Sequence, residues 1–101
     1  MVRLIWSEVA IDELKEVFDY ISKDSKVYAK RQVNKIRQAT KILKASKYIG
    51  KEVEEIGIPT IREIIEGNYR IIYKVMNDSE VVILTIHHSA RDLAKRKIVE
   101  D

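Results

Sequence analysis

The pattern of apolar and polar positions divides the chain into a helical first half and a strand-rich second half. The apolar run Leu4-Ile5-Trp6 is typical of a short strand, and Ser7 behind it can cap a helix. Apolar side chains then recur at helical spacing in two stretches, which are Ala10, Leu14, Val17, Phe18 and Ile21, followed by Ala29, Val33, Ile36, Thr40 and Leu43. The pattern predicts two amphipathic helices in a helical hairpin, with Asp24 or Ser25 capping the second.

Three strand-like runs occupy the second half, at residues 61–66, 69–76 and 81–88. Gly67-Asn68 suits a two-residue hairpin turn because both residues tolerate positive φ. A final short helix is expected from Ala90 to about Val99. We therefore predict one domain, residues 1–101, of the α+β class in the order βααβββα. Its sheet is expected to be antiparallel, with the N-terminal helical hairpin packed on one face and a short C-terminal helix.

The turns also predict which residues face each other across the sheet. Glu66 is expected to pair with Tyr69, Ile65 with Arg70, Ile64 with Ile71, and Arg62 with Tyr73; in the next hairpin Arg70 lies opposite His87, Ile71 opposite Ile86, and Tyr73 opposite Leu84. The face toward the helices then carries Ile64, Ile71, Tyr73, Val75, Val82, Leu84 and Ile86. The other face carries Glu63, Arg70, Lys74, Thr85 and His87 among Ile61, Ile65, Ile72 and Ile83. This mixture of polar and apolar side chains suggests a binding surface.

Composition excludes several classes of function. The chain has 101 residues, no cysteine and two histidines, so disulfides and thiol chemistry are ruled out and a protein-built zinc site is not expected. No apolar run approaches the roughly 20 residues that cross a membrane, and the N-terminus lacks the apolar core of a signal peptide. We expect a cytoplasmic protein without metal or cofactor.

The net charge of +3 conceals an uneven distribution. Between Ser25 and Lys51 there are nine basic residues and no acidic one, whereas six acidic residues lie between Ser7 and Asp24 and five between Glu52 and Glu66. On the second helix, a basic stripe beside the apolar one is formed by Lys26, Lys30, Arg37, Lys41 and Lys44. The stripe is either a solvated helix flank or an electrostatic surface for nucleic acid or an acidic partner.

Several segments resemble the RelE/ParE toxin superfamily. Trp6-Ser7 with Ala10, Leu14 and Tyr20-Ile21 is similar to its opening, and the run from Ile61 through Gly67-Asn68-Tyr69-Arg70 to Tyr73 is similar to its hairpin signature. The ending Ile86-His87-His88-Ser89-Ala90-Arg91-Asp92-Leu93 resembles the His-x-x-Arg-Asp-Leu pattern of the ParE-like, plasmid-stabilisation branch. The resemblance spans nearly the whole chain and agrees with the predicted order of elements.

The resemblance implies the toxin of a type II toxin–antitoxin pair, held inactive by a cognate antitoxin, as a homodimer or in a heterotetramer with it. ParE-like members inhibit DNA gyrase without cutting nucleic acid, and RelE-like members cut messenger RNA on the ribosome. Arg70 matches the arginine that helps RelE-like nucleases hold the phosphate, and Arg91 matches a second such arginine. No tyrosine follows Arg91, and the lysines that precede the Tyr-Arg pair in RelE-like enzymes are missing, with Glu63 nearby instead.

The residues themselves offer candidates for RNA cleavage without a metal, which needs a base, an acid and cations for the phosphorane. His87 or His88 can act as base or acid, Glu63 as an alternative base, and Arg70 with Arg91 as the cations. The motif favours His88 and the predicted face favours His87, so both stay candidates. Residues expected to bind a partner or nucleic acid are the basic stripe together with Arg62, Tyr69 and Tyr73.

Three functions remain open from the sequence. The first is a ParE-like toxin that inhibits DNA gyrase by binding. The second is a RelE-like, ribosome-dependent endoribonuclease that uses Arg70, Arg91 and a histidine. The third is a toxin-fold protein that has lost its activity and serves as a binding module.

Overall fold

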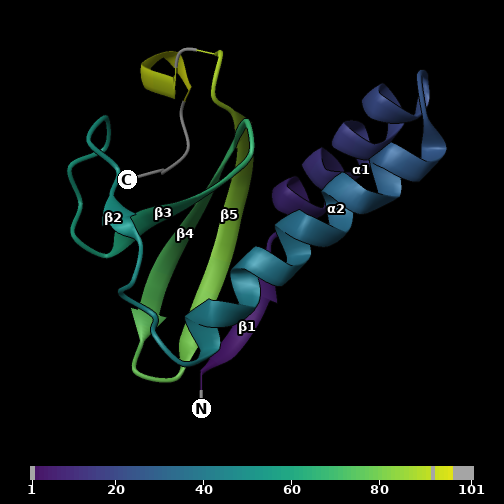
Figure 1. Ribbon diagram of the computed structural model, residues 1–101. Coiled ribbons are helices and arrows are strands. Elements are labelled where there is room, and N and C mark those ends of the chain that lie inside the picture. The colour runs from purple at the N-terminus through teal and green to yellow at the C-terminus, as the bar shows by residue number, and fades with distance from the viewer. Residues whose placement is uncertain (1, 92, 97–101) are drawn as a thin grey trace.

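The computed structural model describes residues 2–91 and 93–96 and places a helical hairpin against one face of a five-stranded sheet (Figure 1). The elements are β1 (Arg3–Trp6), α1 (Glu8–Ser22), α2 (Lys26–Thr40), β2 (Lys51–Glu52), β3 (Ile61–Glu66), β4 (Tyr69–Asn77) and β5 (Glu80–His88), with 3₁₀ helices at Lys41–Lys44 and Leu93–Lys95. The predicted α+β class and the helical hairpin on one face are confirmed. None of the described helices is long and apolar enough to cross a membrane.

Both long helices begin at a serine that satisfies a free backbone amide. Ser7 Oγ accepts a hydrogen bond from the Ala10 amide at 3.0 Å, and Ser25 Oγ accepts one from the Tyr28 amide at 3.1 Å. Such caps stabilise a helix by about 1 kcal/mol each. The predicted apolar stripes supply the helical side of the main core, with Ala10, Leu14, Val17, Ile36 and Leu43.

The strands lie in the order β1-β5-β4-β3-β2, and β1 runs parallel to β5. The expectation of a purely antiparallel sheet is therefore wrong for β1. Tight turns impose antiparallel pairing only on consecutive strands, and β1 is separated from β5 by both helices and three other strands. The two-residue strand β2, which pairs antiparallel to β3, was not predicted.

The β3–β4 hairpin has the predicted register, with Glu66 opposite Tyr69 and Arg62 opposite Tyr73. Its loop differs in one detail. Gly67 alone has a positive φ, of 59°, while Asn68 does not. That is the pattern of a type II′ turn, which needs glycine only at its first central position.

The β4–β5 hairpin keeps the predicted pairing only at one end. Arg70 lies opposite His87 as expected, but Ile72 pairs with Thr85 and Tyr73 with Ile83. The predicted pairing of Tyr73 with Leu84 is wrong because Leu84 is the extra residue of a β-bulge. The bulge reverses the facing of the preceding residues, so Ile83 and Val81 join the core under the helices in place of Leu84 and Val82.

The opposite face of the sheet is covered rather than open. Ile61 and Ile72 pack there in a second apolar cluster with Val53, from the segment after β2, and Leu93, from the C-terminal 3₁₀ helix. The polar residues predicted for this face, Glu63, Thr85 and His87, are at most 3% exposed. The expected open binding surface is therefore a small second core, although Ile65 on the same face remains exposed.

The C-terminal segment closes this second core. Instead of a helix from Ala90 to about Val99, the described part contains only the 3₁₀ helix Leu93–Lys95. The predicted helix beyond residue 96, and Asp92 within it, lie outside the described residues. Leu93 is 2% exposed, so this short turn contributes an apolar side chain that seals the sheet.

Tyr73 joins the main core to the segment that leads into β2. Its side chain is fully buried, and its hydroxyl accepts a hydrogen bond from the Gly50 amide at 3.0 Å. The backbone at Gly50 also lies so close to β3 that a Cβ on Gly50 would be 2.5 Å from the Glu63 carbonyl oxygen. Glycine is therefore required at this position, and the tyrosine hydroxyl is the partner of its buried amide.

We predict that Tyr73→Phe lowers the free energy of unfolding by about 1–3 kcal/mol, because the Gly50 amide loses its acceptor in a buried setting. Tyr48→Phe is the matched control, since Tyr48 is half exposed, and it should change stability by less than about 0.5 kcal/mol. Chemical denaturation of the three proteins measures the difference. Equal stabilities would show that the Tyr73 hydroxyl does not hold this segment.

Candidate functional site

Arg70 on β4 is clamped between two carboxylates. It donates to Glu63 from Nε at 2.9 Å and from Nη2 at 2.5 Å, and to Glu55 from Nη1 at 2.8 Å and from Nη2 at 2.9 Å. The Glu63 side chain is 1% exposed and that of Arg70 16% exposed. Four of the five guanidinium N–H groups are thereby used, in a bidentate arrangement on each side.

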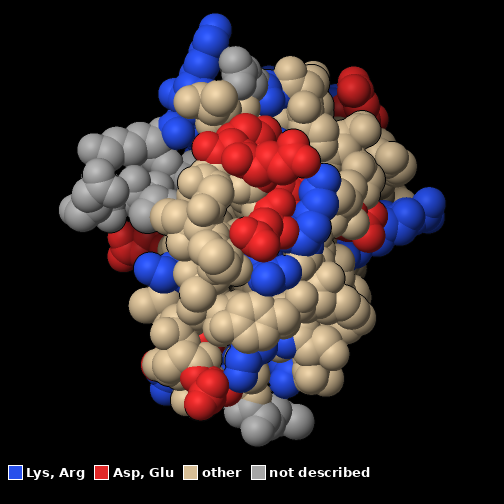
Figure 2. All heavy atoms as spheres, turned by 90° about the vertical axis from the view of Figure 1, so that its left-hand side faces the viewer, with Lys and Arg blue, Asp and Glu red and all other residues tan. Residues whose placement is uncertain are grey.

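The clamp changes the protonation behaviour of its members. Hydrogen bonding from Arg70 lowers the pKa of Glu55 from 4.5 to about 2. Hydrogen bonds to Glu55, and then to Glu63, raise the pKa of Arg70 above its ordinary value. Glu55 belongs to the segment after β2, and Figure 2 shows the acidic side chains that gather on this side of the molecule. The clamp therefore fastens that segment over the second face of the sheet.

His87 on β5 is 1% exposed, and both of its ring nitrogens have partners. Nδ1 lies 2.9 Å from Nη1 of Arg96, and Nε2 lies 3.0 Å from the Arg91 carbonyl oxygen. A guanidinium only donates, so Nδ1 accepts and Nε2 carries the proton that it donates to Arg91. The geometry therefore assigns a neutral histidine with its proton on Nε2.

Arg96 links His87 to a partly buried carboxylate, that of Glu13 on α1. Its Nη2 donates to Glu13 Oε2 and to Thr85 Oγ1, both at 3.1 Å, and Thr85 in turn donates to Glu13 Oε1. Glu13 Oε1 also accepts from the Ile86 amide at 3.1 Å. This network ties the C-terminal segment to α1 and β5. The sequence prediction missed it, because Glu13 and Arg96 are 83 residues apart and share no motif.

His88 and Arg91 lie around a cavity of about 370 Å³ beside the end of α1. His88 Nδ1 accepts from the Ala90 amide at 3.1 Å, and its ring meets that of Tyr69 edge-on with the centroids 5.3 Å apart. Burial raises the pKa of the Tyr69 phenol. Tyr20 also lines the cavity, while the Arg91 side chain is exposed at its rim. Of the predicted site residues, His88, Arg91 and Tyr69 therefore line one cavity, whereas Arg70 is bound to Glu55 and Glu63.

The remaining predicted binding residues fall in different places. Arg62 donates to the carbonyl oxygens of Gly50 and Pro59 and so braces the β2–β3 connection. Tyr73 is buried in the core and does not reach the surface. Of the basic stripe, Arg37, Lys41 and Lys44 line a groove, whereas Lys26 and Lys30 are exposed on the first half of α2 and do not line it.

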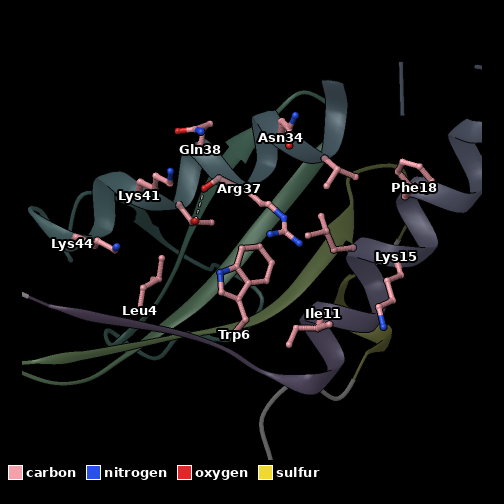
Figure 3. Close-up of a pocket in the computed structure, with 13 residues that line it drawn as sticks. Leu4, Trp6, Ile11, Lys15, Phe18, Asn34, Arg37, Gln38, Lys41 and Lys44 are labelled. Carbon is pink, nitrogen blue, oxygen red and sulfur yellow. Dashed lines mark hydrogen bonds between the residues drawn. The ribbon is translucent and has the colours of Figure 1, made fainter. Parts of the chain in front are cut away.

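That groove lies between β1 and the two helices and has a volume of about 740 Å³ (Figure 3). Its apolar lining includes Leu4, Trp6, Ile11, Leu14, Phe18 and Val33. The sequence prediction did not identify it, although Ile11, at i, i+3 and i+7 spacing with Leu14 and Phe18 of the predicted stripe, widens the apolar face of α1. Within the described ranges 2–91 and 93–96, no group of side chains is arranged to hold a metal ion.

Comparison with known proteins agrees with the fold and gives a family. Residues 4–93 match the model of the family described as the ParE toxin of the type II toxin–antitoxin system, parDE. The fold matches a solved structure titled "Chromosomal ParDE TA system from P. aeruginosa", with a TM-score of 0.71 and 24% sequence identity over 87% of this chain and 96% of that one. No curated protein matches the sequence significantly. The predicted RelE/ParE-like fold is confirmed.

We predict that the Arg70 clamp makes stability depend on pH in acid. The folded-state pKa of Glu55 lies below its ordinary value, so its contribution is complete above about pH 4.5 and is lost as the pH falls toward 2. Glu55→Gln should therefore be less stable than the wild type at neutral pH, and the difference should shrink across that window. Unfolding curves at several pH values measure it.

Glu54→Gln is the matched control, because Glu54 is exposed and forms no ion pair with another described residue. Its difference from the wild type should stay small and nearly constant with pH. If the two variants lose stability equally at every pH, Glu55 does not hold Arg70 in the folded protein.

Proposed function

The chain belongs to the ParE toxin family of type II toxin–antitoxin systems, and we propose that it inhibits DNA gyrase by binding and is neutralised by a cognate antitoxin. Family membership supports the toxin and the antitoxin partner. The choice of binding over RNA cleavage is supported by one observation above others. Arg70, the residue that would hold a phosphate in a RelE-like nuclease, already has two carboxylate partners.

A phosphate at Arg70 would have to displace Glu55 or Glu63. Electrostatic catalysis requires donors that are preorganised and free to meet the charge that develops in the transition state. Here the Arg70 positive charge is offset by two negative ones, of which Glu63 is almost completely buried. The clamp as a whole therefore carries a net negative charge, which repels an incoming phosphodiester.

His87 is also poorly placed for general acid–base work. Its Nδ1 lone pair accepts from Arg96 and its Nε2 proton is donated to a backbone carbonyl. A base must reach the 2′-hydroxyl within hydrogen-bonding distance, and a fully buried ring does not. These contacts favour a structural role for His87, which leaves a binding mechanism as the simpler account of toxicity.

The RelE-like nuclease remains the second candidate for a specific reason. His88, Arg91 and Tyr69 surround one cavity, so an acid–base group, a cation and an aromatic ring are close together without Arg70. In that case His88→Ala or Arg91→Ala should reduce cleavage about 100-fold or more. An inactive binding module is the third candidate, and it requires that expression leaves growth unaffected.

We predict that the purified protein inhibits gyrase supercoiling and leaves ribosome-bound message intact. Both assays use the same protein preparation, and addition of the antitoxin encoded beside the gene should restore supercoiling. His88→Ala should inhibit gyrase about as well as the wild type. Cleaved message with unaffected gyrase would contradict the proposal and establish the nuclease, and absence of both effects would favour the inactive module.

A further inference from the structure

The outer face of α2 carries basic and amide side chains and no acidic one. It is formed by six exposed residues, namely Lys26, Lys30, Arg31, Asn34, Lys35 and Gln38. At 100° per residue these six cover an arc of about 180°, opposite the buried side of the helix, and they extend over about 18 Å of its length. Val27, which is 70% exposed, is the one apolar side chain within the arc.

The four bases of the outer face are not neutralised inside the protein. Within the ranges 2–91 and 93–96, the basic side chains that form ion pairs are Arg3, Lys47, Arg70 and Arg96. Beside the outer face lies a shallow hollow of about 660 Å³ between α2 and the end of β3. Its charged lining residues are Arg31, Lys35 and Glu66, so the hollow is positive on balance.

This arrangement of charge does not stabilise the helix. Lys26 with Lys30, and Arg31 with Lys35, are i, i+4 pairs of like charge, which repel each other on a helix surface. The first turn of α2 begins with Lys26 and contains no acidic residue, although the helix dipole favours negative charge there. By contrast, α1 has Glu8 in its first turn. An anion outside the protein would offset this repulsion.

We propose that the outer face of α2 binds the phosphate backbone of duplex DNA. The lysines and Arg31 pair with phosphates, and the amides of Asn34 and Gln38 donate to phosphate oxygens. Such contacts position a protein on DNA without reading its sequence. The choice of DNA over RNA rests on the proposed function, because gyrase acts on duplex DNA. What the inference adds is that the toxin contacts the nucleic acid as well as the enzyme.

The composition of the outer face favours a duplex over other occupants. A single strand stacks its bases on successive aromatic rings, and α2 has one aromatic residue, Tyr28. A membrane surface takes up the apolar side of a helix, whereas that of α2, with Ile36, is buried in the main core. A protein partner anchors on apolar or aromatic side chains near the centre of its interface, and Val27 lies at one end. A duplex backbone needs only cations and hydrogen-bond donors.

The salt dependence of DNA binding tests the proposal. The purified toxin, without antitoxin, is titrated into a fluorescein-labelled DNA duplex of arbitrary sequence, and anisotropy is followed between about 50 and 200 mM salt. Four phosphate contacts predict that the logarithm of the binding constant falls with the logarithm of the salt concentration, with a slope of about −3 to −4. A slope shallower than about −1, or no binding at the lowest salt concentration, would overturn the proposal.

Charge neutralisation then locates the contact. Arg31→Gln combined with Lys35→Gln should make the slope shallower by about 2 and weaken binding at least about tenfold at low salt. Lys51→Gln combined with Lys95→Gln is the matched control, since it removes the same charge from exposed positions of β2 and the C-terminal 3₁₀ helix, and its slope should equal that of the wild type.

Glu66→Gln provides a change of opposite sign. It removes the acid beside Arg31 and Lys35 and should strengthen binding about two- to threefold. Circular dichroism confirms that all variants keep the wild-type fold. Equal loss of binding in the two double variants would overturn the outer face of α2 as the site, as would weaker binding by Glu66→Gln.

The outcomes separate this site from the proposed function. Gyrase inhibition without salt-dependent binding to the duplex would overturn the site and leave the proposed function intact. Duplex binding with the predicted slope, but without gyrase inhibition or toxicity, would support the site and overturn the proposed function. Single-stranded DNA or polyglutamate that binds as tightly as the duplex would overturn the choice of occupant.

Discussion

The central strands β4 and β5 bury side chains on both faces, while the helices cover only one of them. The second face must therefore be closed by the segment after β2 and by the C-terminal 3₁₀ helix, which contribute Val53 and Leu93. These are short pieces with little apolar surface of their own. Hydrogen bonds and ion pairs hold them in place. Arg70 binds Glu55 of the segment after β2, and Arg96 of the C-terminal segment binds Glu13 and His87.

This constraint explains why residues that look catalytic in the sequence have structural partners. Glu63, Thr85 and His87 face the second core and are almost fully buried, so each requires a hydrogen-bonding partner. Arg70 and Arg96 supply those partners. The arginine that the family resemblance associates with phosphate binding is thereby engaged inside the protein, and this is the physical reason for favouring inhibition by binding over RNA cleavage.

Local features of the fold could be predicted from the sequence, and long-range ones could not. The serine caps, the helical stripes and the β3–β4 register depend on neighbouring residues and are confirmed. The bulge at Leu84 was not predictable, because Val81 to Leu84 are all apolar and no alternation indicates which of them face the helices. The partners of Arg70 and Arg96 come from distant segments that carry no motif, so the covered second face was mistaken for a surface.

The structure also shows which of the unevenly distributed charges are paired inside the protein and which are not. Both acidic blocks lose charge to internal ion pairs, since Glu13 pairs with Arg96 and Glu55 and Glu63 pair with Arg70. In the basic block, Arg37 and Lys41 have no acidic partner among the residues described and line an apolar groove. The surface that the chain offers to a partner is therefore more basic than a net charge of +3 suggests.

The claim that Arg70 has a structural role is tested most directly by replacing the whole clamp. Buried ion triads can often be exchanged for uncharged side chains of similar size without loss of the fold. We expect a variant that combines Arg70→Met, Glu55→Gln and Glu63→Met to unfold cooperatively, and we expect this variant and the wild type to arrest growth equally. A triple variant that is folded by the same criterion but no longer toxic would contradict the account, because Arg70 would then act on the target itself.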